Sequence, residues 1–247
     1  MAVTGTPPSL ARAAFAVACA GVLAAAVVLA DSGSAGAARA AATVIGQTPK
    51  TPSPNCPTPR GDNVPADKAC QAMGRVTGFQ TMADGRRNPF KVRQQGTIVA
   101  WSVDISKPTK KEQNFFEEAL SKSGPPSARL AILKPKGDDN YKLVKQSPVV
   151  QVKSVLGNRP VFTLTDPLKV RKGMVVALTT TTWLSNLADH GAGNADSWRA
   201  SREQGQCLDE QDLLERSRPQ QKVGGQRAYG CTYEGARLLY WAYLARR

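Results

Sequence analysis

Histidine is nearly absent from this chain of 247 residues, which contains it only at His190. Cysteine is also scarce, and none of the five cysteines has the Cys-x-x-Cys spacing or the neighbouring histidine of a structural zinc site. No Gly-x-Ser-x-Gly nucleophile elbow occurs. Gly191-x-Gly193 and Gly224-Gly225 lack the preceding strand and following helix of a phosphate-binding loop. We therefore expect no metal and no cofactor.

Acidic residues are also few: the chain has 19 Asp and Glu but 33 Lys and Arg, which gives a formal net charge of +14. Such a field favours anionic polymers or membrane surfaces as partners. The basic residues are dispersed along the chain, which predicts a solvated cationic surface rather than a groove for a specific nucleic acid.

The N-terminus predicts export. Residues 13–30 are uncharged and apolar, and the small-x-small triplet Ala38-Arg39-Ala40 follows them. Residues 1–40 are therefore interpreted as a secretory signal peptide. An uncleaved anchor is the alternative, because the apolar stretch is close to the length that spans a bilayer. After cleavage, no transmembrane segment is expected, and the protein is predicted to be secreted or held at the extracellular face of the cell envelope.

Cleavage would remove Cys19 and leave an even number of cysteines: Cys56, Cys70, Cys207 and Cys231. In an exported chain this count suggests two disulfides, with three possible pairings. The pairing that closes the shortest loops, Cys56 with Cys70 and Cys207 with Cys231, is the one we expect.

Residues 41–70 are predicted to form a proline-rich extended leader, and residues 71–247 a single domain of antiparallel strands. GTIVAWSVDIS (96–106) alternates, with Val99, Trp101, Val103 and Ile105 on one face. Short β-type runs separated by turn clusters predict the other strands: 73–80, 129–135, 141–148, 149–155, 160–165 and 173–183. One short helix is inserted after the capping-box signature Thr109-x-x-Glu112. The fold class is mainly β, an antiparallel β-sandwich or jelly roll.

The C-terminal stretch YGCTYEGARLLYWAYL (229–244) is apolar on both faces when read as a strand. Arg237 and Glu234 make it too polar to span a bilayer. We predict a central strand near the sandwich core, with Cys231 fixing the preceding arm. An aromatic platform for a ligand is the alternative.

The run NPFKVRQQGTIVAWSVDISKPTKKEQNFF, the strand pair PVFTLTDPLKVRKGMVVALTTTTW and the terminal YGCTYEGARLLYWAYL resemble a group of uncharacterised exported proteins of high-GC Gram-positive bacteria. This resemblance implies a β-sandwich but no activity, and therefore no site residue. PLKVRKGMVVAL also resembles the strand-turn-strand rhythm of jelly-roll adhesion and carbohydrate-binding modules.

One group of side chains combines aromatic rings with cations around a single loop: Trp183, His190, Trp198, Arg199 and Arg202. Aromatic faces stack on sugar rings, and arginine binds carboxylates or phosphates with two donors. If these side chains meet on an exposed surface, they form a saccharide or anionic-polymer site. The alternative places both tryptophans in the core with the arginines extending outward.

The main functional hypothesis is an exported, non-catalytic binding or structural module of the cell envelope that recognises carbohydrate or anionic polymer. The alternative is a secreted hydrolase that uses His190 with Ser197 or Ser185 and with Asp189 or Asp196. Asp189, Asn194 and Asp196 also offer oxygen ligands for calcium, although they lack the spacing of an EF-hand loop. Asp104 and the Glu117-Glu118 pair are the candidate carboxylates for glycoside hydrolysis.

Overall fold

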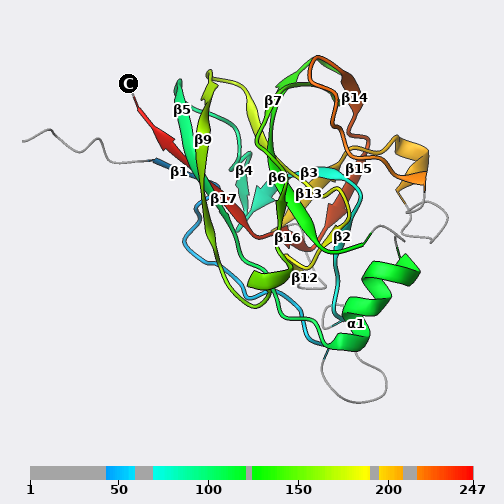
Figure 1. The fold of residues 1–247 in the computed structure, drawn as a ribbon. Coiled ribbons are helices and arrows are strands. Elements are labelled where there is room, and N and C mark those ends of the chain that lie inside the picture. Colours follow the sequence, from blue (N-terminus) through cyan, green and yellow to red (C-terminus); the bar gives the residue numbers. More distant parts are fainter. Residues whose placement is uncertain (1–42, 59–68, 121–123, 190–194, 208–215, 247) are drawn as a thin grey trace, which may run out of the picture. The chain divides into compact units, whose positions relative to one another are not determined.

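A computed structural model describes residues 43–58, 69–120, 124–189, 195–207 and 216–246 (Figure 1). The chain divides into two units, residues 1–38 and residues 39–247, and every described residue belongs to the second. The predicted signal peptide lies outside the described residues. Within the described ranges, no helix has the length and apolar character needed to cross a bilayer.

The prediction of a mainly β, antiparallel fold with one short inserted helix is confirmed. The smaller sheet has four strands, with Tyr240–Ala245 (β17) and Gly96–Val103 (β5) in its centre. Thr43–Ile45 (β1) and Val161–Val170 (β9) form its edges. All three pairings are antiparallel (Figure 1).

The larger sheet is also antiparallel. Its strands, in spatial order, are β14 (Gln226–Ala228), β7 (Asn140–Gln146), β6 (Ser127–Pro135), β10 (Val175–Thr179), β3 (Thr77–Ala83), β13 (Ser197–Ala200) and β15 (Cys231–Glu234). Two short strands join it, β4 (Arg86–Arg87) beside β3 and β8 (Val150–Gln151) beside β6. Separate two-stranded ladders pair β11 (Trp183–Leu184) with β2 (Met73–Gly74) and β12 (Leu187–Asp189) with β16 (Ala236–Leu238).

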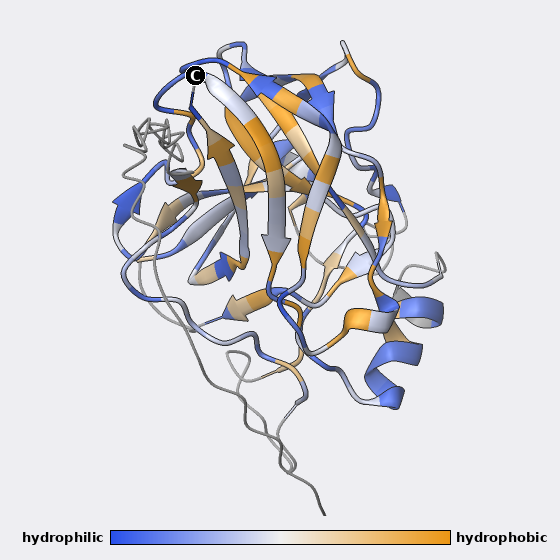
Figure 2. Cartoon of the chain, turned by 60° about the vertical axis from the view of Figure 1, so that its left-hand side comes forward, coloured by the Kyte–Doolittle hydropathy of each residue, from blue (hydrophilic) through white to orange (hydrophobic). Residues whose placement is uncertain are grey.

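The hydrophobic core contains side chains from both the smaller and the larger sheet. Figure 2 shows hydrophobic residues distributed along the strands. Tyr240 on β17 shows how the sheets are joined: its ring stacks on Phe90 with centroids 4.0 Å apart, and its hydroxyl donates to the Val176 carbonyl of β10 at 3.0 Å. The hydroxyl is buried, so this bond satisfies a polar group that water cannot reach. Core packing and a specific hydrogen bond therefore hold the two sheets together at one residue.

Strand β5 departs from the predicted alternation at Val99. Its pairing with both neighbours shifts at this residue, which is a β-bulge. The bulge places Ile98, rather than Val99, in the core together with Trp101 and Val103. An extra residue in a strand moves the side chains that precede it to the opposite face of the sheet. A hydrophobic pattern alone does not reveal such a residue.

The C-terminal stretch divides among three strands rather than forming one. Within it, β17 is the predicted central strand: Tyr240, Ala242 and Leu244 face the main core, whereas Leu239 and Trp241 form a second small cluster with Ala188. Arg159 covers the outer side of the Trp241 ring at 4.4 Å from its centroid. Both faces of β17 are therefore covered, as predicted.

The inserted helix α1 (Lys110–Asn114) begins with the predicted capping box. The Glu112 amide donates to the Thr109 hydroxyl at 3.3 Å, and the Thr109 amide donates to the Glu112 carboxylate at 2.6 Å. A π-helical turn, Phe115–Leu120, follows it. The buried Phe116 packs against Trp183 with centroids 5.0 Å apart, which joins the helix to the sandwich.

The described part of the leader is extended, but it is not a loose tether. Strand β1 adds an edge to the smaller sheet, because Thr43, Val44 and Ile45 are β-formers that precede the first proline of this segment. Further on, Asn55 exchanges two hydrogen bonds with the backbone of Asp189, at 2.6 and 3.1 Å. The leader is thus bound along the domain that it precedes in the sequence.

Both predicted disulfides are present. Cys56 pairs with Cys70, with Cα atoms 4.5 Å apart, and Cys207 pairs with Cys231, with Cα atoms 5.1 Å apart. The first bridge closes a loop within the leader, and the second connects β15 to the segment after β13. Crosslinks of this kind stabilise mainly by restricting the unfolded chain.

Burial raises the pKa of Tyr240 and of Tyr229 well above the usual phenol range. Folding keeps both phenols neutral at pH values at which they ionise in the unfolded chain. The contribution of the two buried phenols to the free energy of unfolding is therefore complete below about pH 10 and is lost as the pH rises above it. We expect the free energy of unfolding to fall above about pH 10, by up to about 1.4 kcal/mol per pH unit for each phenol. Urea denaturation between pH 8 and pH 11.5, roughly the range that brackets phenol ionisation, measures this slope.

The matched control is Tyr240→Phe, which removes one ionisable phenol. Above pH 10, the free energy of unfolding of this variant should fall less steeply with pH than that of the parent protein, by the contribution of one phenol. At neutral pH, the variant should be less stable by about 1 to 2 kcal/mol, because the Val176 carbonyl loses its donor. An unchanged alkaline slope in this variant would show that Tyr240 titrates as an exposed phenol does.

Candidate functional site

Trp183, the first of the sequence-predicted site residues, is a core side chain. It is fully buried on β11, and its indole N–H donates to the Gly124 carbonyl at 3.1 Å. Its ring also packs against Phe116, which joins the π-helical turn Phe115–Leu120 to the sandwich. This position makes it a packing residue and not a surface for stacking sugars.

Trp198 and Arg202 do come together. The Trp198 ring, 6% exposed, stacks on Tyr233 with centroids 4.6 Å apart. Arg202, 5% exposed, donates to the Tyr233 hydroxyl and, from Nε, to the Ser217 hydroxyl at 3.1 Å. Both line a hollow of about 330 Å³ together with Asp189. Only a small part of the Trp198 ring reaches solvent there, so the hollow offers little aromatic surface to a ligand.

Arg199 lies apart from this hollow. Successive side chains of a strand point to opposite faces, so Arg199 leaves β13 on the side opposite Trp198. It forms an ion pair with Asp139 in the turn between β6 and β7. The structure therefore brings two of the five predicted residues to one hollow and places Trp183 and Arg199 elsewhere, while His190 lies outside the described residues.

The residues of the alternative hydrolase and calcium hypotheses are only partly described, because His190 and Asn194 fall outside the described ranges. Ser197 shares a hydrogen bond of 2.8 Å with Thr81, and Ser185 is fully buried. Among the described residues, no group of three or more metal-ligating side chains occurs. Both hypotheses stay predictions.

Two of the three candidate carboxylates for glycoside hydrolysis, Asp104 and Glu117, have structural partners. Asp104 accepts from Arg159 at 2.6 Å, and that guanidinium also covers Trp241. Glu117 pairs with Lys153 at 3.0 Å. Both carboxylates therefore take part in ion pairs at the surface, which hold loops against the sandwich.

Sequence reasoning missed a cluster of cations at one end of the sandwich. Lys145 on β7, Lys169 on β9 and Arg171 just after β9 line a hollow of about 450 Å³. Gln95, Gly96, Val170 and Met174 complete the lining, so no carboxylate of the described residues lines it. Among the described residues, the hollow therefore has three positive charges and no compensating negative one.

One glycine lines this hollow, and a second turns the chain between two of its lining residues, Arg171 and Met174. Gly96, at the start of β5, is so close to β17 that a Cβ would lie 2.5 Å from the Ala245 carbonyl oxygen. Gly173 has φ +88°, a left-handed conformation that turns the chain between β9 and β10. Its amide donates to the Val92 carbonyl at 2.9 Å. This turn presents Arg171 and Lys172 to solvent beside the open end of the sheets.

A second, smaller hollow of about 150 Å³ is lined by the same segment of chain, since Gln94 lines it and Gln95 lines the first. Its charged lining residues are Lys91, Arg93 and Arg246, again with no described carboxylate. We name the six cations of the two hollows the basic end: Lys91, Arg93, Lys145, Lys169, Arg171 and Arg246.

The cations of the basic end have few protein partners. All six are exposed, and none of them forms an ion pair with a described residue. Arg246 donates to the Thr43 hydroxyl at 2.9 Å, and Arg93 reaches the Arg87 and Asn88 carbonyls at 3.4 and 3.5 Å. Six like charges that no described residue neutralises attract anions from solution.

Comparison with known proteins gives no relative: the chain matches no family model, no curated protein and no solved structure. The resemblance to exported proteins of high-GC Gram-positive bacteria therefore stays a prediction.

Replacing Trp183 with alanine tests its structural role. We expect the free energy of unfolding to fall by about 3 to 5 kcal/mol, because the change leaves a cavity and removes the donor to Gly124. Urea denaturation at neutral pH measures this loss. A variant as stable as the parent protein would mean that the Trp183 ring is not packed in the core.

Proposed function

We propose that this protein is an exported, non-catalytic module that binds an anionic polymer outside the cytoplasm through its basic end. The observation that carries the proposal is the pair of hollows, both lined by the segment before β5, whose charged lining residues are all cations. A net charge of +14 adds a long-range attraction of the same sign.

The arrangement favours a polymer over a small anion. The two hollows share the segment between β4 and β5, with Lys91 and Arg93 on the side of β1 and β17, and Lys169 and Arg171 beside β9. An extended chain with repeated negative groups can contact both hollows at once. Contacts in series increase the overall affinity even when each exposed charge pair contributes little.

Charge supports this proposal better than sugar stacking does. Trp183 is fully buried, and Trp198 and Trp241 are each 6% exposed. Sugar-binding surfaces need exposed aromatic faces, whereas the basic end exposes its charges. Extracellular anionic polymers carry carboxylate or phosphate groups, and both pair with Lys and Arg.

Two features support export. The two disulfides form and persist in oxidising compartments. The predicted signal peptide provides the route.

The test compares two triple variants of equal charge. Lys145→Gln, Lys169→Gln and Arg171→Gln remove three cations of the basic end, and the control changes Lys107, Lys110 and Lys111 to Gln near the inserted helix. Isothermal titration with poly(glycerol phosphate) and with poly(glutamate) should show binding at least about tenfold weaker for the first variant and within about twofold of the parent for the control. Raising the salt from about 0.05 to 0.3 M should weaken binding by the parent protein.

Equal losses in the two variants would show that binding depends on total charge and not on the basic end. Failure of the parent protein to bind either polymer at low salt would overturn the proposal. Neutral dextran serves as the uncharged control and should not bind.

A further inference from the structure

The smaller hollow of the basic end has the higher density of positive charge. Three cations line each hollow, but the volume is about 150 Å³ for the smaller hollow and about 450 Å³ for the larger. A volume of about 150 Å³ is that of roughly five molecules of liquid water. The positive potential is therefore concentrated in a space that suits a group of a few heavy atoms.

Strand β1 lines this hollow with all three of its residues and is held close to the segment before β5. Gly46, directly after β1, has φ +92°, and its amide donates to the Pro89 carbonyl at 3.3 Å. A Cβ at Gly46 would overlap the Phe90 ring. Only glycine allows this close approach, which places β1 beside Pro89.

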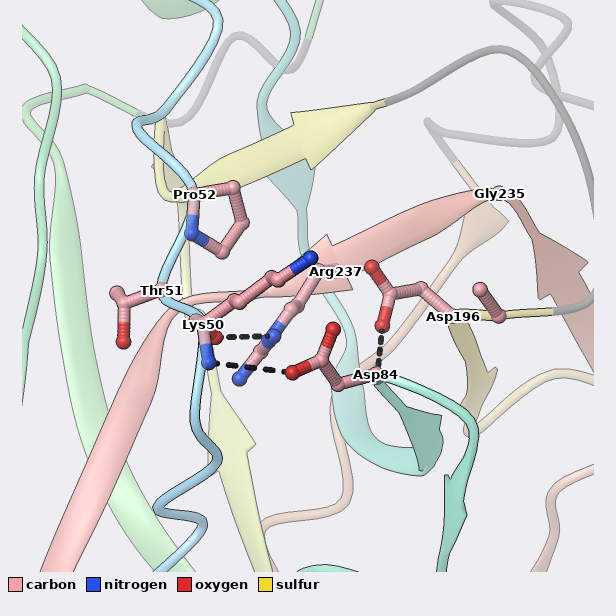
Figure 3. A pocket seen from close by; sticks show the side chains of 8 residues that line it. Lys50, Thr51, Pro52, Asp84, Asp196, Gly235 and Arg237 are labelled. Atoms are coloured by element: carbon pink, nitrogen blue, oxygen red, sulfur yellow. Dashed lines mark hydrogen bonds between the residues drawn. The ribbon is translucent and has the colours of Figure 1, made fainter.

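The leader is fixed to the domain again beyond Gly46, where it crosses β16 (Figure 3). Arg237 donates to the Lys50 carbonyl at 2.9 Å, and the Lys50 amide donates to an Asp84 carboxylate oxygen at 3.1 Å. With β17 paired to β1 on one side and these bonds further along the leader, the lining that β1 contributes is held in place.

The three cations come from separate positions, and none of them forms an ion pair with a described residue. Arg246 donates from Nε to the Thr43 hydroxyl at 2.9 Å, and Arg93 Nη2 lies 3.4 and 3.5 Å from two carbonyl oxygens. The backbone of Lys91 forms a bridge with Val175. A guanidinium has five N–H groups, so both arginines keep donors for a ligand.

Most of the other lining residues are apolar: Val44, Ile45, Pro89 and Leu244. Ile45 and Leu244 are buried core residues. Apolar surroundings strengthen the attraction between a cation and an anion, because they screen charge less than water does.

Charge and size together favour one of the anionic groups that extracellular polymers carry. A carboxylate or a phosphodiester has a single negative charge, which one guanidinium can pair with. A phosphomonoester has a charge of about −1.5 to −2 at neutral pH, on three acceptor oxygens. Three cations around a space of this size therefore match a phosphomonoester best.

We propose that the smaller hollow binds the terminal phosphomonoester of the anionic polymer, and that the larger hollow contacts the phosphodiesters that follow. This inference rests on the proposed function, because it names the end group of the same ligand. Gln94 lines the smaller hollow and Gln95 the larger, so one polymer chain can reach both. The protein thus binds such a polymer by its end.

Titration of the isotope-labelled protein with glycerol 3-phosphate, followed by amide chemical shifts, tests the site itself. The shifts should saturate and be largest at Thr43, Lys91 and Arg93. Dimethyl phosphate, methyl sulfate and acetate, which carry one charge each, should bind at least about tenfold more weakly. Shifts that do not saturate by about 20 mM, or equal binding of dimethyl phosphate, would overturn the assignment.

The pH dependence distinguishes a dianion site from a general anion site. The second pKa of a phosphomonoester is about 6. The charged lining residues among those described are Lys91, Arg93 and Arg246, and lysine and arginine side chains stay protonated between about pH 5 and 8. Glycerol 3-phosphate should therefore bind about tenfold more weakly at about pH 5 than at about pH 7.5. Equal affinity at both pH values would contradict binding of the dianion.

A pair of double variants with equal charge locates the site. Lys91→Gln with Arg93→Gln, which keeps the contact of Arg246 with Thr43, should weaken glycerol 3-phosphate binding by at least about tenfold. Lys107→Gln with Lys110→Gln, near the inserted helix, is the matched control and should bind within about twofold of the parent. Equal losses in the two variants would refute a site in the smaller hollow.

Short poly(glycerol phosphate), with its terminal phosphomonoester intact or removed by alkaline phosphatase, connects the site to the polymer. In isothermal titration, the intact polymer should bind at least about tenfold more tightly. Equal binding of the two forms would refute recognition of the polymer end and leave the proposed function standing. Saturable binding of glycerol 3-phosphate by a protein that binds neither polymer would refute the proposed function and restrict the hollow to small phosphomonoesters.

Discussion

Strand β17 and the contact that it makes through Tyr240 are the constraint on which the rest of this structure depends. The strand lies between β1 and β5, so it connects the edge strand β1 to the rest of the smaller sheet. The Tyr240 hydroxyl then reaches the backbone of β10 in the larger sheet. Removing this strand would leave β1 without its partner, expose the core face of β5 and disassemble the end of the sandwich where the cations gather.

The basic end follows from this closure. At the open end of the sheets, the ends of β9 and β17 and the segment before β5 bring together cations from distant parts of the chain, and nothing in the described protein neutralises them. Where the leader crosses β16, Arg237 donates to the Lys50 carbonyl at 2.9 Å and binds the leader to the domain. The end of the molecule where the cations gather is therefore suited to polyanions.

Some of these features could be read from the sequence because they are local. The capping box at Thr109 and Glu112 depends on residues three positions apart, the disulfides on short loops, and the burial of β17 on a continuous apolar run. The β-bulge at Val99 was not predictable from alternation, because one inserted residue leaves the composition of the strand unchanged. The strand at Thr43–Ile45 was missed because the proline-rich sequence after it dominates the segment.

The sites themselves depend on pairing between distant strands. Lys145, Lys169 and Arg246 are far apart in the sequence, so their dispersal suggested a general cationic surface, and only the strand order shows that they share one end. Sequence proximity was misleading in the other direction, because it grouped side chains that do not meet: Trp183, Trp198, Arg199 and Arg202. Neighbouring side chains of a strand point to opposite faces, and tryptophans are often buried in the core rather than exposed at the surface.

The most direct test of the central claim is a residue-resolved map of the polymer contact. Amide chemical shifts of the isotope-labelled protein, recorded during titration with a short poly(glycerol phosphate), should change at Lys91, Gly96, Lys169, Arg171 and Arg246 and stay constant in α1. Shifts spread evenly over all exposed cations, or concentrated around α1, would contradict the account.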